Sequence, residues 1–345
     1  EARPTEREFA AATMDTIAAD LTSSQLKGFR VKRGRRYLFL YNCSDTFAEG
    51  TSRIMETMFP GLIAYLRSLG LKPREPELPL VVIMFRTKAD FQRFKLVPSG
   101  MVAYYNVIEN HIILYEQSGL TQVNPELAMR QKIAMIAHEN VHQILHNVGV
   151  QQRLAVWPQW FAEGLAEFFA PTDVDHKLRW KGAGKVNDLR MYELERYLKA
   201  RKSVAPAGQM IDHTVQAARL SSTGYATAWA LVHFLARYER ARLSRYLRSL
   251  SETRPLTGAV DMAQAGKVPS NKTRFVEMFG DDFPTLETRL VNHLKQLPYK
   301  PPFADLPHIV AKITLAKTGR DNRLANVFLT EAVARRWIQE TLQGL

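Results

Sequence analysis

The stretch Ala137–His146, AHENVHQILH, carries three histidines at four-residue intervals. Its surroundings predict a helix over residues 124–149. Asn124 followed by Pro125 is typical of a helix start, Gly149 is typical of a helix end, and apolar residues recur between them at helical spacing. Residues four apart lie on one face of a helix, with Cβ atoms about 5–6 Å apart. This face is either a metal site or an amphipathic surface that happens to be rich in histidine.

The metal hypothesis rests on the first two histidines. His138 and His142, one helical turn apart, can both reach one zinc ion at about 2.0–2.1 Å. Glu139 stands beside the first of them, where it could take the proton of a water activated at the metal. Ordinary helix faces also show the pattern His138-Glu139-x-x-His142. A third ligand is therefore needed to distinguish the two interpretations.

A segment downstream offers that third ligand. A catalytic zinc keeps three protein ligands and an open position. In Trp157–Phe168, WPQWFAEGLAEF, Pro158 suits a helix start, and Glu163 follows His142 by 21 residues. This spacing leaves room for one loop and a return helix packed against the first. Gly164 removes a side chain at a place where two helices have to approach closely.

Two more residues on these helices need an interpretation. Glu167 lies one turn after Glu163 on the same face. It could orient a histidine through the second ring nitrogen, or it could replace Glu163 as the ligand. His146 continues the histidine stripe, but a third histidine from one helix does not easily complete a tetrahedral site. We expect His146 to lie beside the site or in solvent.

The two segments together resemble the gluzincin metallopeptidases of the peptidase MA-like superfamily. The shared features are His-Glu-x-x-His and, about twenty residues later, Trp-x-x-Glu-Gly. The longer match Trp-Phe-Ala-Glu-Gly-Leu-Ala-Glu-Phe-Phe is similar to a family of exported bacterial peptidase MA-like proteins. The resemblance implies one zinc per chain, held by His138, His142 and Glu163, with Glu139 as the base. The Gly-x-Met-x-Asn element of the aminopeptidase branch is missing, so an aminopeptidase specificity is not implied.

The resemblance also implies a hydrogen-bond donor for the substrate oxygen, about sixty residues beyond the third ligand. Tyr225 follows Glu163 by 62 residues and opens a long apolar helix, so it is the first candidate. His233, two turns later, is the second candidate. In gluzincins an edge strand above the zinc pairs with the substrate backbone, and we expect His111–Tyr115 to fill this role.

Hydropathy patterns predict an α+β, zincin-like fold, with a small mixed sheet in the N-terminal part and mainly helices afterwards. The predicted organisation is an N-terminal helical extension (1–34), a catalytic domain (35–297) with sheet (35–120) and helical (121–297) parts, and a helical C-terminal tail (298–345). Strands are predicted at Tyr37–Tyr41, Leu80–Phe85, Met101–Tyr105 and His111–Tyr115.

Composition limits the partners that the chain can have. The net charge of +13 favours acidic partners, including anionic envelope polymers. The basic residues are spread out apart from the run at 30–36, and no nucleic-acid-binding motif is present, so we expect no specific nucleic acid partner. No apolar run reaches the ~20 residues of a transmembrane helix. The chain starts at Glu1, and a removed signal peptide would make it a secreted, periplasmic or envelope protein.

The sequence therefore favours a zinc metallopeptidase that acts on peptide or protein substrates. The alternative is a catalytically silent zincin-fold protein that serves as a binding module or scaffold at an anionic envelope surface. A nucleic-acid binder, suggested by the charge alone, is the third hypothesis.

Overall fold

The structure, a computed structural model, describes residues 12–95, 101–117, 125–171, 180, 182–201, 205–256, 270–302, 309–315, 322–328 and 331–343. The chain divides into two compact units. The first comprises residues 1–117 and 130–299, and the second comprises residues 118–129 and 300–345. The predicted boundary at 297/298 lies two residues from the point where the first unit ends.

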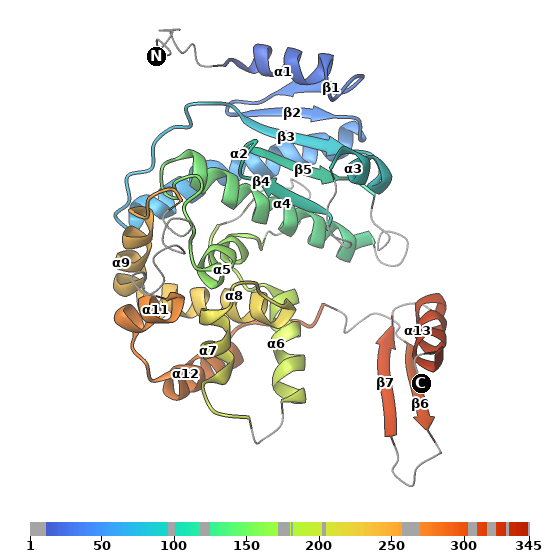
Figure 1. The fold of residues 1–345 in the computed structure, drawn as a ribbon, viewed down its shortest axis with the longest axis vertical. Coiled ribbons are helices and arrows are strands. Elements are labelled where there is room, and N and C mark those ends of the chain that lie inside the picture. Colours follow the sequence, from blue (N-terminus) through green and yellow to red (C-terminus); the bar gives the residue numbers. More distant parts are fainter. Residues whose placement is uncertain are drawn as a thin grey trace, which may run out of the picture. The chain divides into compact units, whose positions relative to one another are not determined.

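The first unit is built on a mixed five-stranded sheet (Figure 1). The strand order is β1-β2-β3-β5-β4. The three central strands are parallel to one another, and the two outer strands are antiparallel to their neighbours. The bounds are β1 Arg30–Arg33, β2 Tyr37–Tyr41, β3 Leu80–Phe85, β4 Ala103–Asn106 and β5 His111–Tyr115. The predicted bounds of β2, β3 and β5 are confirmed, and the α+β class is confirmed with them.

Successive residues of the sheet alternate between two apolar cores. Tyr37 and Phe39 of β2 belong to the large core, which they share with helices α2 (Asp45–Ser68) and α4 (Pro125–Asn147). Leu38 and Leu40 belong to a smaller core on the opposite face, with α1 (Met14–Ser23) and α3 (Lys88–Phe94). Because side chains on a strand alternate with period two, a fully apolar strand indicates a sheet that is covered on both faces.

The N-terminal segment differs from the predicted helical extension. Helix α1 packs on the sheet through Ala18 and Leu21, and β1 is a strand of the sheet itself. The predicted boundary at residue 34 is therefore wrong, because the sheet begins at Arg30. The reason is chemical: β1 reads Arg-Val-Lys-Arg and lies at an edge, so it shows no apolar strand pattern.

After the sheet the first unit is helical. The bounds are α5 Gln159–Phe169, α6 Asp188–Ala200, α7 Gln209–Gln216, α8 Ser222–Tyr238, α9 Arg240–Ser251, α11 Asn271–Phe279 and α12 Phe283–Lys295. Helix α4 starts at Pro125 as predicted, while Asn124 lies outside the described residues. Gly149 follows the helix with φ +74°, the left-handed conformation that the predicted helix end requires.

Buried amides fasten α4 to the sheet. The Tyr37 hydroxyl donates a hydrogen bond to Oδ1 of Asn140 at 2.8 Å. Nε2 of Gln143 donates to the carbonyl oxygens of Val81 and Asn110, at 3.0 and 2.9 Å. A buried hydrogen-bonded amide fixes orientation, because moving it would leave its partners unsatisfied. These bonds hold one face of α4 on the sheet and leave the histidine face for α5.

Helices α5 and α8 approach closely at Gly164. A Cβ atom at this position would lie 2.6 Å from the carbonyl oxygen of Ala228 and 2.9 Å from Cγ2 of Val232. Both neighbours belong to α8, and no real Cβ atom tolerates a backbone oxygen so close. The sequence prediction of a close helix contact at Gly164 is thus confirmed, and α8 is the helix that makes it.

The second unit corrects the predicted helical tail. Residues 309–343 contain strands β6 (Ile309–Leu315) and β7 (Asn322–Phe328), paired antiparallel, and helix α13 (Glu331–Gln343). Its small core includes Ala311, Phe328 and Ala334. The segment IVAKITL of β6 is rich in β-branched residues that favour strands, so the prediction of helix was wrong on local chemistry.

We predict that Gly164→Ala destabilises the protein. Alanine is the better helix former, so at a solvent-exposed helix position it would stabilise the helix by about 1 kcal/mol. Here the added methyl group must push α5 away from the α8 backbone, and overpacking of this kind costs about 1–3 kcal/mol. Urea unfolding should show a lower midpoint. A midpoint equal to or above that of the wild type would contradict the close approach.

Candidate metal centre

Three potential ligands converge between α4 and α5. Nε2 of His138 lies 3.1 Å from Oε2 of Glu163 and 3.2 Å from Nε2 of His142. Nε2 of His142 lies 3.6 Å from the same carboxylate oxygen. Among the described residues, these three form the group that could hold a metal ion. The structure thus brings together the three residues that the sequence analysis selected.

The spacing of these donor atoms suits a tetrahedral ion. Ligand bonds of about 2.0–2.1 Å with tetrahedral angles place the donor atoms about 3.3–3.4 Å apart. The observed separations of 3.1, 3.2 and 3.6 Å lie on either side of this value. Two imidazole nitrogens and one carboxylate oxygen are a donor set that zinc accepts, and three ligands leave a fourth position for another group.

Glu167 holds the opposite side of His138. Its Oε1 lies 3.2 Å from Nδ1 of His138, the ring nitrogen that faces away from the cluster. Asn187 donates to the other carboxylate oxygen at 2.9 Å, and Arg190 donates to Oε1 at 2.6 Å. Of the two roles left open by the sequence, this position favours the one in which Glu167 orients the histidine while Glu163 faces the ion.

The electrostatics of the cluster favour a cation. Burial by itself would lower the pKa of His138, but hydrogen bonds with Glu163 and Glu167 raise it well above its usual value. Burial would raise the pKa of Glu163, but the charge of His142 and hydrogen bonds with both histidines lower it. In the same way, His138 and Arg190 lower the pKa of Glu167 to about 2 against the effect of burial. Both carboxylates are therefore ionised at neutral pH.

Glu139 is held by the edge of the sheet. The backbone N–H of Tyr105 donates to Oε2 of Glu139 at 2.8 Å. Tyr105 belongs to β4, which is an edge strand, whereas His111–Tyr115 forms β5 and lies between β3 and β4. The prediction that His111–Tyr115 is the edge strand is therefore wrong. The hairpin was recognised from sequence, but which of its strands is outermost depends on pairing with β3.

Tyr225 lies beside the group of His138, His142 and Glu163, at the start of α8. Its ring centroid is 6.5 Å from that of His138. Burial and the nearby charges of Glu163 and Glu139 raise the pKa of the Tyr225 hydroxyl. The hydroxyl therefore keeps its proton at neutral pH and can act as a hydrogen-bond donor.

The second candidate donor is engaged elsewhere. Nδ1 of His233 lies 2.9 Å from Nε2 of His293, and its Nε2 lies 3.1 Å from the carbonyl oxygen of Gly184. His233 also follows Tyr225 by eight residues, which is about 12 Å along a helix. With both ring nitrogens paired away from the cluster, His233 is the weaker candidate.

His146 does not join the ligand group. Its ring stacks on Tyr105, with centroids 5.5 Å apart, and its buried Nδ1 has no hydrogen-bond partner among the described residues. This position beside the site agrees with what its place in the histidine stripe predicted.

The basic run at 30–36 is largely neutralised by ion pairs with nearby carboxylates. Four of its five cationic side chains have an acidic partner. The pairs are Arg30–Asp45 at 2.7 Å, Lys32–Glu49 at 2.5 Å, Arg33–Asp15 at 2.7 Å and Arg36–Glu75 at 2.8 Å. Most of the positive charge of this segment therefore has a carboxylate nearby.

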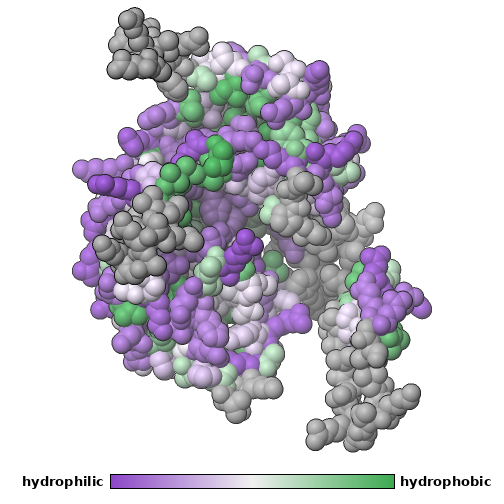
Figure 2. All heavy atoms as spheres, in the orientation of Figure 1, coloured by the Kyte–Doolittle hydropathy of each residue, from purple (hydrophilic) through white to green (hydrophobic). Residues whose placement is uncertain are grey.

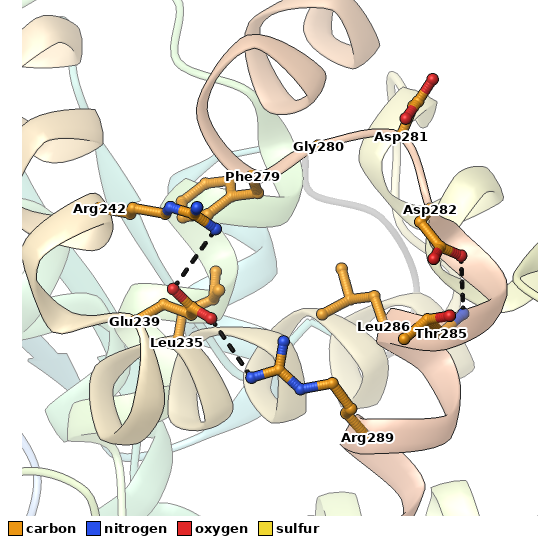
Figure 3. A pocket seen from close by; sticks show the side chains of 10 residues that line it. All are labelled: Leu235, Glu239, Arg242, Phe279, Gly280, Asp281, Asp282, Thr285, Leu286 and Arg289. Atoms are coloured by element: carbon orange, nitrogen blue, oxygen red, sulfur yellow. Dashed lines mark hydrogen bonds and ion pairs between the residues drawn. The ribbon is translucent and has the colours of Figure 1, made fainter.

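A separate hollow at the far end of α8 carries no comparable chemistry (Figure 3). Its volume is about 220 Å³, below the ~300 Å³ at which ligand pockets begin. Arg242 and Arg289 both face Glu239, at 3.5 and 3.3 Å, so both arginines of the hollow are paired. Leu235 in its wall follows Tyr225 by ten residues, about 15 Å along the helix.

No helix among the described residues combines the length and hydropathy needed to cross a bilayer. Hydrophilic residues make up most of the described surface on the face drawn in Figure 2.

Comparison with known proteins adds one match. Residues 132–257 match a family model described as "Protein of unknown function (DUF1570)". The matched segment includes all the site residues described above on α4, α5, α6 and α8. No curated protein matches the chain.

We predict that the purified chain binds one zinc ion and that His142→Gln abolishes binding. His146→Gln is the matched control, because it removes the next histidine of the same stripe without touching the three donor atoms. Zinc analysis by mass spectrometry after dialysis checks both variants. Loss of zinc from His146→Gln, with His142→Gln unaffected, would contradict the ligand assignment.

Proposed function

We propose that the protein is a zinc-dependent metallopeptidase of the gluzincin type that hydrolyses peptide bonds. The observation that carries the proposal is the convergence of two imidazole nitrogens and one carboxylate oxygen. Their separations are close to those of the donor atoms around a tetrahedral zinc ion. Glu139 follows the first histidine directly, and the ring of Tyr225 lies 6.5 Å from that of His138. The sequence resemblance to gluzincins assigns the same residues.

The ligands of the zinc would be His138, His142 and Glu163, with Glu167 orienting the first of them. When bound, zinc supplies Lewis-acid chemistry that polarises a carbonyl group and lowers the pKa of water. The remaining steps fall to side chains of the protein.

Glu139 acts as the general base and then as the general acid. Its carboxylate takes a proton from the attacking water as the water oxygen bonds to the scissile carbonyl carbon. When the C–N bond breaks, the same group gives that proton to the leaving amine. The hydrogen bond from the Tyr105 N–H fixes one of its oxygens, which limits the rotation of the side chain.

Tyr225 donates a hydrogen bond to the oxygen that becomes negative when the carbonyl is attacked. Because burial and nearby carboxylates raise its pKa, the hydroxyl remains protonated over the neutral range. A donor placed where charge develops typically contributes 10²–10³-fold, or about 3–4 kcal/mol, to the rate.

Strand β4 is positioned to guide an extended substrate. It is the outer strand of the sheet, and its Tyr105 contacts the proposed base. A peptide that adds to such an edge brings its backbone past Glu139 through main-chain hydrogen bonds. This mode selects for peptide and protein substrates.

A catalytically silent binding protein is the second candidate, and one surface feature favours it. Helix α9 contains no acidic residue and exposes four arginines, Arg240, Arg242, Arg245 and Arg248, of which Arg242 pairs with Glu239 just before the helix. A cationic face of this kind favours anionic polymers of the cell envelope. Binding of an anionic polymer is compatible with hydrolysis on one molecule, but only hydrolysis requires an intact base.

We predict that Glu139→Gln retains one zinc per chain and lowers kcat on a peptide library by about 10²–10⁴-fold, the usual contribution of general acid–base catalysis. Glutamine keeps the size of the side chain and can still accept the hydrogen bond from Tyr105, but it cannot take a proton. Glu75→Gln, which alters an exposed carboxylate of the connector before β3, is the control.

Undiminished hydrolysis by Glu139→Gln would contradict the mechanism. A wild-type chain without zinc and without hydrolysis, yet with salt-sensitive binding to an anionic polymer, would favour the silent binding protein instead.

A further inference from the structure

One arginine, Arg190, contacts both Glu167 and Tyr225 at the candidate site. Arg190 lies in the first turn of α6, which follows the N-cap residue Asn187. Its side chain is only 18% exposed. No spacing in the sequence connects this helix with the metal cluster, and the peptidase proposal assigns Arg190 no role.

The first contact of Arg190 leads to a metal ligand. Its terminal nitrogen donates to Oε1 of Glu167 at 2.6 Å, and the same oxygen lies 3.2 Å from Nδ1 of His138. The carboxylate is thus shared between a guanidinium and an imidazole. Without the guanidinium it could rotate away from the ring, and the orientation of His138 would be less fixed.

The second contact of Arg190 is with the proposed oxyanion donor. Cζ of the guanidinium lies 5.2 Å from the ring centroid of Tyr225, within the range of a cation–π interaction. A contact with the ring face restricts where the ring can turn and therefore where its hydroxyl points.

The third contact anchors the helix that carries Tyr225. Arg190 donates to Oε2 of Glu193 at 2.8 Å, and the other oxygen of Glu193 accepts a hydrogen bond from Ser222 at 2.6 Å. Ser222 is the first residue of α8, three positions before Tyr225. The arginine therefore connects α6 with the first turn of α8 as well as with α5.

We propose that Arg190 is a positioning residue that fixes the side chains of His138 and Tyr225 relative to each other. It acts through Glu167 on the ligand and through its planar face on the tyrosine. The inference rests on the proposed peptidase function for its kinetic part, whereas the part that concerns His138 requires only metal binding.

The shape of the side chain is central to this role. A guanidinium offers several donors in one plane and a flat face for an aromatic ring, whereas the ammonium of lysine is a compact point charge. Lysine at this position can still pair with Glu167. It cannot at the same time pair with Glu193 and lie flat on Tyr225.

The first arm of the test measures zinc affinity by competition with a chromophoric chelator. Arg190→Met should weaken zinc binding by about 10–100-fold, the usual effect of losing a group that orients a ligand. Arg190→Lys, which keeps the charge beside Glu167, should bind zinc more tightly than the methionine variant.

The second arm measures turnover of a peptide substrate at saturating zinc. Arg190→Lys should lower kcat by about 10–100-fold with little change in KM, because the misplaced hydroxyl acts only on the transition state. In a Tyr225→Phe background the same lysine substitution should have no further effect on kcat, because no hydroxyl remains to be positioned. A purely structural role for Arg190 would lower kcat equally in both backgrounds.

Arg201 provides the matched control. It is the C-cap residue of α6 and forms a buried ion pair with Glu287, away from the cluster. Arg201→Met and Arg201→Lys should change thermal stability without changing zinc affinity or the coupling with Tyr225. They separate the loss of a buried arginine in general from the loss of this one.

Wild-type zinc affinity in a folded Arg190→Met variant would overturn the inference, as would kcat effects of Arg190→Lys and Tyr225→Phe that simply multiply. Should Arg190→Met fail to fold, Arg190→Lys decides the question through the coupling with Tyr225. A wild-type chain that binds zinc but cleaves no peptide would refute the peptidase proposal alone, and the affinity arm would still test the contact with Glu167.

Discussion

The structure around the candidate site depends on one imidazole that is held from both sides. His138 has a carboxylate against each ring nitrogen, Glu163 at 3.1 Å and Glu167 at 3.2 Å. Two ionised carboxylates in a buried region are costly unless each is paired and hydrogen-bonded. His138 supplies part of that compensation for both. Arg190 also pairs with Glu167, and Glu163 faces the position that suits a metal ion.

The scaffold fixes this arrangement through three layers of contact. Buried amides hold α4 on the sheet, so its histidine face has one possible direction. Gly164 lets α5 lie directly against α8, and Tyr225 at the start of α8 lies 6.5 Å from the ring of His138. The outer strand β4 reaches Glu139 through the backbone of Tyr105. Strand β4, helices α4 and α5 and the start of α8 therefore all contribute residues to the candidate site.

Much of this was accessible from the sequence because the signals are local. A continuous apolar run predicted β3, strand and hairpin patterns predicted β2 and β5 with correct bounds, and capping residues predicted α4. The four-residue spacing placed His138 and His142 on one helix face, and the resemblance to gluzincins selected Glu163 as the third donor. Strand β1 was missed because a charged edge strand has no apolar pattern, and β6 was missed although its β-branched residues favoured a strand.

The rest depends on tertiary packing that no spacing reveals. Which strand of the β4–β5 hairpin is outermost is decided by pairing with β3. Arg190 lies 27 residues beyond Glu163, on a helix whose sequence shows an ordinary N-cap and an ordinary charged surface. Only the folded chain shows that the first turn of α6 faces Glu167 and Tyr225. Residues that support a site from a third element are in general less visible in sequence than the ligands they support.

The most direct test of the account is a crystal structure of the zinc-loaded protein with anomalous diffraction measured on both sides of the zinc absorption edge. We expect one strong anomalous peak per chain, about 2.0–2.1 Å from Nε2 of His138, Nε2 of His142 and a carboxylate oxygen of Glu163. Absence of a peak at this place in crystals grown with zinc, or a peak held by other residues, would contradict it.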